Sequence, residues 1–244
     1  MISIIIPVYN AAPFLMRCVK SLQRFVSAKF QIILVDDGST DGSAQLCDQL
    51  ALADNRIIVL HQQNKGVSAA RNAGMSIAVG QWLWFVDADD YIIQNVSEPS
   101  EQTTIVFMGC VWCENEQSTF MNASVNEIPY NTWRCLFRRD KVEQEKLKFN
   151  IGRQYAEDQE FILKYMLADN DRQIEVNNNY VYRYTIRKGS AITSKNKKCK
   201  QLFDIIGVWF SILFSAIGQK KIFEMWILRE LKRLGKSAII TLIR

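Results

Sequence analysis

The stretch Ile32-Ile33-Leu34-Val35-Asp36-Asp37-Gly38-Ser39-Thr40-Asp41-Gly42-Ser43 decides the fold class of this chain. It opens with four apolar residues in a row, a pattern typical of a strand that is buried on both faces. Two aspartates and a glycine then end the strand, and Ser39 or Thr40 is expected to cap a following helix. A buried strand that runs through a polar turn into a helix is the unit of a parallel α/β sheet.

The same unit recurs through the first third of the chain. Further continuous apolar runs predict strands at Ile2–Ile6, Ile57–Leu60 and Trp82–Val86, and the first of these favours a strand over a targeting signal. Stretches with helical spacing lie between the runs, at residues 12–26, 43–53 and 67–79. This alternation predicts an α/β fold with a doubly wound, mostly parallel sheet, which binds ligands at the carboxyl ends of its strands.

The pattern changes after residue 96. We expect strands at 105–112 and 176–184, an irregular charged stretch at 137–152, and a helix at 157–168 that begins with acidic residues. These features divide the chain into a body and a tail. The predicted units are a body of residues 1–194, with halves at 1–96 and 97–194, and a basic, apolar helical tail at 195–244.

Composition excludes several classes of protein. The chain has 244 residues, of which 48% are hydrophobic and 23% charged, so it is neither disordered nor collagen-like. Six cysteines do not make a disulfide scaffold in a chain of this length, and we expect a reducing cytosol. Cys110 and Cys113 favour two cysteines on or beside a strand over a zinc site. His61 is the single histidine and no nucleophile motif accompanies it, which argues against Ser-His-Asp catalysis.

Charge is distributed unevenly along the chain. From Lys188 onward there are 12 Lys and Arg against 3 Asp and Glu, which leaves 18 against 22 before it. The uncharged residues 205–217 would form a helix of about 20 Å, shorter than the roughly 30 Å core of a bilayer. Residues 220–233 place Phe223, Trp226 and Ile227 on one side and basic residues largely elsewhere. We therefore expect a helix that lies on an anionic membrane surface.

The tail is open to two other interpretations. A helical hairpin could pack on the body or on a second subunit in a homodimer. Nucleic-acid binding is not expected, because the basic residues alternate with apolar ones and do not form an exposed stripe.

Acidic residues follow two of the predicted strands. Asp87 and Asp89 are hard oxygen ligands that suit Mg²⁺ or Mn²⁺, although a solvated acidic turn would look the same. Asp36 and Asp37 carry more charge than a turn needs, and a carboxylate there could accept the N–H of a uracil or guanine ring.

Two other polar groups are candidates for chemistry. The segment around Asn64-Lys65-Gly66, with Arg71 beyond it, offers cations and a helix N-terminus to a diphosphate, or forms a solvated helix face. Glu157-Asp158 is either ordinary helix-start chemistry or a general base.

Together these motifs closely resemble the family 2 glycosyltransferases with the GT-A fold, over about residues 1–193. A fifth element, Glu157-Asp158-Gln159-Glu160-Phe161, is similar to that family's Glu-Asp-x-x-Phe element, and Trp133 and Phe149 continue the match. The four ordered motifs are Ile4-Ile5-Ile6-Pro7-Val8-Tyr9-Asn10, Val35-Asp36-Asp37-Gly38-Ser39-Thr40-Asp41, Asn64-Lys65-Gly66-Val67-Ser68-Ala69-Ala70-Arg71-Asn72-Ala73-Gly74 and Phe85-Val86-Asp87-Ala88-Asp89-Asp90.

The resemblance implies inverting transfer of a sugar from a nucleotide-diphosphate donor, expected to be a UDP-sugar, to a hydroxyl of a glycan or lipid-linked glycan. It implies a divalent metal, Mn²⁺ or Mg²⁺, and an enzyme in the cytoplasm at the inner face of the cell membrane. Asp158 matches the catalytic base, Asp89 the direct metal ligand, and Asp87 the acid on the ribose and metal side. Donor contacts are implied for Pro7, Tyr9, Asp37, Lys65, Arg71, Asp87 and Ala88, and acceptor-side roles for Trp133 and Glu157.

Two other functions would share the α/β donor-binding half. A sugar nucleotidyltransferase usually has a glycine-rich, basic loop after the first strand, where Pro7-Val8-Tyr9-Asn10 stands here. A non-catalytic protein that binds nucleotide-sugars would be expected to lose one of the acids at Asp87, Asp89, Glu157 or Asp158, and all of them are present.

Overall fold

A computed structural model describes residues 1–114, 117–170, 172–185, 198–218 and 229–236. The strands are β1 (Ile2–Val8), β2 (Phe30–Asp36), β3 (Ile57–His61), β4 (Trp82–Phe85), β5 (Tyr91–Ile92), β6 (Ile105–Glu114), β7 (Gln117–Met121), β8 (Cys135–Arg138) and β9 (Ile174–Thr185). The helices are α1 (Ala12–Phe25), α2 (Ser43–Ala53), α3 (Val67–Ser76), the short 3₁₀ helix η1 (Thr132–Arg134), α4 (Arg139–Gln144), α5 (Glu157–Ala168) and α6 (Lys198–Gly218). Residues 229–236 are also helical.

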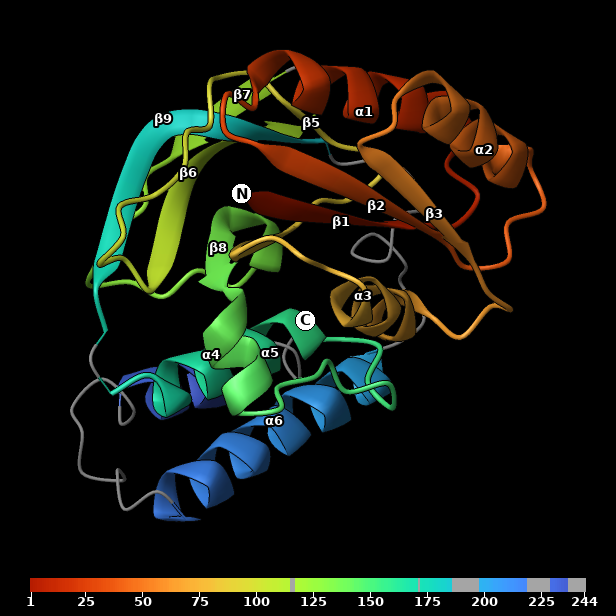
Figure 1. The fold of residues 1–244 in the computed structure, drawn as a ribbon. Coiled ribbons are helices and arrows are strands. Elements are labelled where there is room, and N and C mark those ends of the chain that lie inside the picture. The colour runs from red at the N-terminus through yellow and green to blue at the C-terminus, as the bar shows by residue number, and fades with distance from the viewer. Residues whose placement is uncertain (115–116, 171, 186–197, 219–228, 237–244) are drawn as a thin grey trace.

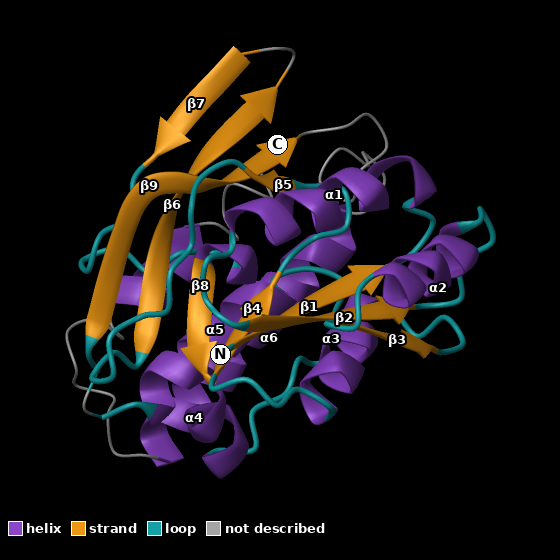
Figure 2. Ribbon diagram, turned by 45° about the horizontal axis from the view of Figure 1, so that its top comes forward, coloured by secondary structure: helices purple, strands orange, loops and turns teal. Residues whose placement is uncertain are grey.

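All nine strands belong to one curled sheet. Its order is β3-β2-β1-β4-β8-β6-β9-β5, and β7 pairs with β6. The four N-terminal strands are parallel to one another, whereas β8 runs antiparallel to both β4 and β6. In Figures 1 and 2, the part that contains β6, β7 and β9 curls away from the part that contains β1, β2 and β3.

Helices cover both faces of the sheet, as the unbroken apolar runs predict. Figure 1 shows α1 and α2 on one side and α3, α4, α5 and α6 on the other. Along β1, Ile4 and Ile6 pack in the core with α1 and α2, while Ile5 packs in the second core with α3 and α5. Successive side chains of a strand point to opposite faces, so a strand between two helical layers is mostly apolar. The buried exceptions Ser3 on β1 and Gln31 on β2 are hydrogen-bonded to each other at 2.7 Å.

Most predicted elements are confirmed, and two local predictions are wrong. Residues 137–152 are not irregular throughout, because β8 and α4 occupy part of this stretch. Neither Ser39 nor Thr40 caps α2. The N-cap is Gly42, at a φ of 91°, and Asp41 Oδ1 accepts the N–H of Ser43 at 3.0 Å. Both Cys110 and Cys113 are buried in β6, as expected for strand cysteines.

The turns that follow β1 and β2 are hydrogen-bonded to each other. Asn10, in the left-handed region at a φ of 49°, accepts the N–H of Thr40 at 2.8 Å through its Oδ1. In return, Ser43 Oγ accepts the N–H of Ala11 at 2.8 Å. These bonds satisfy two amides of the segments that lead into α1 and α2, and they fix the two loops at the carboxyl edge of the sheet.

The tail helix α6 is longer than the apolar run on which its prediction rested. It has 21 residues, hence a length of about 31 Å. Among the described residues it is the one helix that is long and apolar enough to cross a membrane, judged by length and composition. One face, with Val208, Ile212 and Ala216, is nevertheless fully buried in the core that α5 also lines. The predicted amphipathic segment 220–233 lies mostly outside the described residues.

Candidate active site

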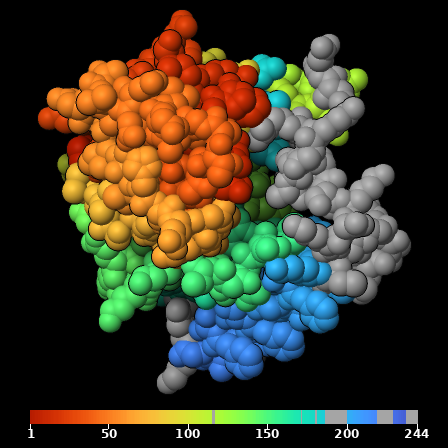
Figure 3. Space-filling model, turned by 90° about the vertical axis from the view of Figure 1, so that its right-hand side faces the viewer, coloured from red at the N-terminus to blue at the C-terminus, as the bar shows by residue number. Residues whose placement is uncertain are grey.

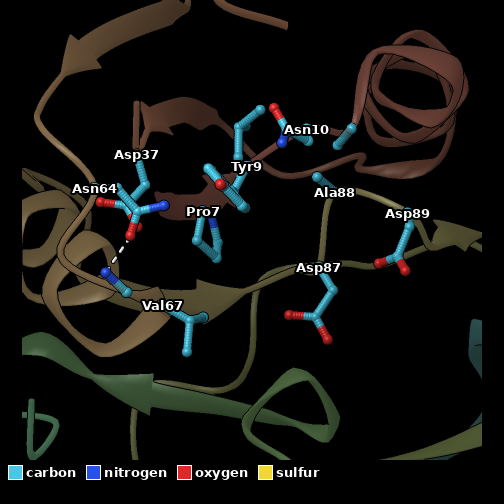
Figure 4. Close-up of a pocket in the computed structure, with 12 residues that line it drawn as sticks. Pro7, Tyr9, Asn10, Asp37, Asn64, Val67, Asp87, Ala88 and Asp89 are labelled. Carbon is cyan, nitrogen blue, oxygen red and sulfur yellow. Dashed lines mark hydrogen bonds between the residues drawn. The ribbon is translucent and has the colours of Figure 1, made fainter. Parts of the chain in front are cut away.

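An open pocket of about 550 Å³ lies where β1, β2 and β4 end. Its lining comes from the end of β1, from the loops after these strands, and from the loop between β3 and α3 with the first residue of that helix. Pro7 and Tyr9 lie between Asp37 on one side and Asp87 and Asp89 on the other (Figure 4). The lining residues are Pro7, Val8, Tyr9, Asn10, Ala11, Asp37, Asn64, Gly66, Val67, Asp87, Ala88 and Asp89. The pocket therefore has the position expected for a ligand site in a doubly wound sheet.

Asp37 holds the loop that leads into α3. Its Oδ1 accepts hydrogen bonds from Gln62 Nε2 at 2.7 Å and from the Lys65 N–H at 2.8 Å, and its Oδ2 accepts the Gly66 N–H at 2.8 Å. A carboxylate offers about four acceptor positions, so one remains for a ligand donor. The neighbouring Gly38 has a φ of 73°, and a Cβ there would lie 2.9 Å from the Asn64 nitrogen. The loop can approach this closely only because residue 38 is glycine.

Arg71 on α3 joins three acidic side chains next to the pocket. Its Nη1 lies 2.6 Å from Asp158 Oδ1 and 3.3 Å from Glu157 Oε1, and its Nη2 lies 3.2 Å from Asp87 Oδ1. The Arg71 side chain is only 4% exposed. Asp158 is oriented further by Thr132, whose N–H donates to Oδ2 at 3.1 Å. The cluster thus connects the loop after β4 with the first turn of α5.

The cluster carries more negative than positive charge. Burial raises the pKa of Asp87 to about 6, an effect that Asp89 and Asp158 reinforce and Arg71 opposes. Burial and the Asp158 carboxylate raise the pKa of Glu157 to about 7. Burial alone would lower the pKa of Arg71, but the three carboxylates outweigh it and raise that pKa. The acids therefore keep Arg71 charged, and the single guanidinium does not neutralise all of the carboxylates around it.

Tyr182 and Asp90 support the acidic loop after β4 through buried hydrogen bonds. The Tyr182 hydroxyl accepts the N–H of Asp87 at 3.0 Å and donates to Asp90 Oδ2 at 2.9 Å. Burial, followed by the charges of Asp87 and Asp89, raises the pKa of Asp90 to about 9. Trp133 stacks on the Tyr182 ring at 4.3 Å between centroids. This buried layer fixes the backbone from which Asp87 and Asp89 project in the same direction (Figure 4).

The structure brings most of the predicted site residues together. Six of them line the pocket, namely Pro7, Tyr9, Asp37, Asp87, Ala88 and Asp89. Arg71, Glu157 and Asp158 form the adjoining cluster, so Arg71 faces carboxylates where a diphosphate contact was predicted. The Lys65 residue is exposed, and only its backbone N–H is placed, by Asp37. Trp133 is 2% exposed in the core, where it stacks on Tyr182, and its acceptor-side role stays a prediction.

Sequence reasoning missed several residues of this site. Asn10 and Asn64 line the pocket and stood inside quoted motifs, so their polar side chains were a usable signal. Thr132 and Tyr182 carried no such signal. Thr132 acts through its backbone N–H, which any residue but proline would offer, and Tyr182 lies 95 residues from Asp87.

The donor set suits a divalent cation that also binds a phosphate. Among the residues that the structure describes, no group of three or more His, Cys, Asp or Glu side chains could hold a metal ion by itself. Mg²⁺ commonly takes one or two carboxylates and completes its shell with water and substrate phosphates. Asp87 and Asp89 line the same pocket, and their carboxylates project to the same side of the loop (Figure 4). The carboxylates of Asp87 and Asp89 therefore fit a divalent cation that is also bound by a phosphate.

Comparison with known proteins identifies the family. The sequence model of "Glycosyl transferase family 2" matches residues 3–156. EpsJ of Bacillus subtilis, named an uncharacterized glycosyltransferase, is 33% identical over 189 residues, which are 67% of this chain and 55% of EpsJ. The chain therefore spans about half the length of that relative.

Solved structures share the fold. TarS of S. aureus in complex with UDP-GlcNAc superposes with a TM-score of 0.72 at 21% identity, over 87% of this chain and 66% of that one. The mannosyltransferase PcManGT from Pyrobaculum calidifontis, solved with GDP-Man and Mn²⁺, gives a TM-score of 0.64 at 13% identity, over 98% and 75%. These likenesses confirm the expected GT-A fold. With its family model matched over more than half of its length, the chain belongs to glycosyl transferase family 2.

Proposed function

We propose that this protein transfers a sugar from a nucleotide-diphosphate donor to an acceptor hydroxyl, with inversion at the anomeric carbon. The observation that carries the proposal is the linkage of the donor-sized pocket to Asp158 through Arg71 and Asp87. A pocket that binds a nucleotide-sugar needs a base beside the reacting carbon, and the first turn of α5 supplies one. Family membership and the fold shared with nucleotide-sugar enzymes support this assignment.

The donor proposed is a UDP-sugar. Asp37 keeps one acceptor position after its three hydrogen bonds, and that position suits the imide N–H of uracil. The exposed ring of Tyr9 and the side chain of Pro7 offer apolar surface to the base beside it. TarS, which has this fold, was solved with UDP-GlcNAc, in agreement with the proposal.

The proposed transfer is a single displacement. The acceptor oxygen forms a bond to the anomeric carbon while the bond from that carbon to the diphosphate oxygen breaks, and the electron pair leaves with the nucleoside diphosphate. Asp158 takes the acceptor proton, and Arg71 and the Thr132 N–H orient its carboxylate for that task. Asp89 and Asp87 would hold Mn²⁺ or Mg²⁺, which when bound neutralises the leaving diphosphate.

The acceptor is proposed to be a glycan or lipid-linked glycan that meets the enzyme at the inner face of a membrane. The outer face of α6 carries Phe203, Phe210 and Phe214 in helical register, with Phe203 71% and Phe214 66% exposed. Figure 3 shows α6, in blue, at the molecular surface. Exposed basic residues of the described tail are Lys200, Arg229, Lys232 and Lys236. Because the opposite face of α6 is buried, we propose that the helix lies along the bilayer and does not cross it. The proposed start of the tail, at residue 195, lies outside the described residues.

Donor binding should require the metal. A screen of UDP-sugars by thermal shift is expected to raise the melting temperature of the wild type in Mn²⁺ and to lose that increase in excess chelator. Asp89→Ala should remove the metal-dependent part of the shift while the unliganded protein melts near the wild-type temperature. Equal donor stabilisation with and without chelator would contradict the metal role.

The base is tested by Asp158→Asn, which keeps the size and part of the hydrogen bonding but cannot accept a proton. We expect release of UDP from the best donor of the screen to slow by about 10²-fold or more, with donor affinity near that of the wild type. Glu157→Gln is the matched control, since it alters the neighbouring acid, and it should cost less. A rate within a few-fold of wild type for Asp158→Asn would show that Asp158 is only a helix-start acid.

Membrane binding is tested with the full chain and two exposed-residue variants. Each apolar side chain of α6 that leaves water should contribute about 1.5–3 kcal/mol, and each nearby Lys or Arg about 1 kcal/mol at an anionic surface. We expect sedimentation with phosphatidylserine vesicles to fall strongly for Phe203→Ser/Phe214→Ser. The matched double variant Leu52→Ser/Ile151→Ser, on other exposed surfaces, should pellet like wild type. Negligible pelleting of the wild type on anionic vesicles would reject the proposal.

A further inference from the structure

The loop that leads into the proposed base is hydrogen-bonded to the tail helix. Asp204 on α6 accepts the backbone N–H groups of Gln154 and Tyr155 through its Oδ2, both at 3.1 Å. These two residues lie directly before the N-cap of α5, and Asp158 is the second residue of that helix. We propose that Asp204 is a positioning residue for the catalytic base, so that α6 completes the active site. The inference rests on the proposed function of Asp158.

The residue between the anchored amides and the helix has a backbone that needs support. Ala156 lies in the left-handed region at a φ of 59°, and it is the N-cap of α5. A residue other than glycine adopts this conformation at a cost and keeps it only where the surrounding structure holds it. Asp204 restrains the chain on one side of Ala156, and Arg71 and the Thr132 N–H restrain Asp158 on the other side. Loss of the Asp204 contacts would let the turn relax and move the base.

A second set of contacts fixes α6 in one register against α5. Arg153 Nη1 donates to the backbone oxygen of Asp204 at 3.1 Å, and Arg153 Nε donates to Glu160. Ser211 Oγ donates to Glu160 Oε1 at 2.6 Å, and Lys164 Nζ lies 2.8 Å from the same oxygen. Glu160 is 3% exposed, so its charge is stable in the interior only with these partners.

Gly207 makes the close approach of Arg153 possible. A Cβ at this position would lie 2.4 Å from Arg153 Nη1 and 3.2 Å from its Cζ. Asp204, Gly207 and Ser211 are spaced by three and four residues, so they share one side of α6. Glycine inside a helix disfavours that helix. What Gly207 contributes instead is space for the guanidinium that bonds both Asp204 and Glu160.

The contact itself is tested by hydrogen exchange on the full-length protein without ligand. In Asp204→Ala, the amides of Gln154 and Tyr155 and the first turn of α5 should exchange at least about tenfold faster, because their acceptor is gone. Ile217→Ser, an exposed change three turns further along the same helix, is the control and should leave these amides unchanged. Unaltered exchange in folded Asp204→Ala would overturn the proposal.

The consequence for catalysis is tested by UDP release from the best UDP-sugar of the screen. For Asp204→Ala we expect kcat to fall by about tenfold or more with a donor KM within about twofold of wild type, since small misplacements of reacting groups are costly. Asp204→Asn keeps an amide oxygen as acceptor and should recover most of the rate. Gly207→Ala, which favours the helix but displaces Arg153, should lower kcat as well.

A double variant separates this inference from the proposed function. If Asp204 acts through Asp158, then Asp158→Asn/Asp204→Ala should be no slower than Asp158→Asn alone. Multiplying losses, or a wild-type kcat for Asp204→Ala, would overturn the positioning role and leave the base assignment intact. A wild-type rate for Asp158→Asn would overturn both.

Discussion

The buried guanidinium of Arg71 holds together two parts of the chain that are far apart in sequence. It contacts Asp87 after β4 and Glu157 and Asp158 on α5, in a cluster where the Arg71 side chain is 4% and the Asp87 side chain 29% exposed. Removing charges from water is costly unless each finds partners, and removing one partner of a buried pair destabilises strongly. Three carboxylates surround this one cation, and burial, reinforced by that excess of negative charge, raises the pKa of Asp87 and Glu157. That excess is compatible with the metal and diphosphate chemistry proposed for the neighbouring pocket.

The rest of the fold determines where Arg71 lies. Helix α3 can lie close to β1 because residue 74 is glycine. A Cβ at Gly74 would lie 2.4 Å from Ile5 Cγ2. Asn72, which follows Arg71 on α3, donates through Nδ2 to the Phe149 backbone oxygen and accepts the Phe149 N–H through Oδ1, both at 2.9 Å. The Phe149 ring then lies 5.2 Å from the Arg71 guanidinium and stacks on Phe161 of α5 at 4.2 Å. The two bonds between the Asn72 side-chain amide and the Phe149 backbone, together with the two ring contacts, thus fix the guanidinium against the start of α5.

The sequence predicted the parts of this structure that depend on local patterns. Apolar runs predicted β1 to β4, because strands covered on both faces are apolar at most positions. Pocket residues such as Asp37 and Asp89 could be found because they follow those strands directly. Contacts between distant segments left no local signal, so the burial of Trp133 and the bonds from Tyr182 to the acidic loop were not predicted. Arg71 was assigned to the right region with a different partner, since a cation in a motif does not reveal which anion it meets.

Arg71 bridges Asp158 and Asp87 through its two separate terminal nitrogens. Arg71→Lys tests this directly, since lysine keeps the charge but offers a single nitrogen and no fork. The decisive measurement is the rate of UDP release by this variant relative to wild type at saturating donor, in protein shown to be folded by circular dichroism. We predict a loss of about 10²-fold, because Asp158 and Asp87 would no longer be held together. A rate within about threefold of wild type would contradict this role of Arg71.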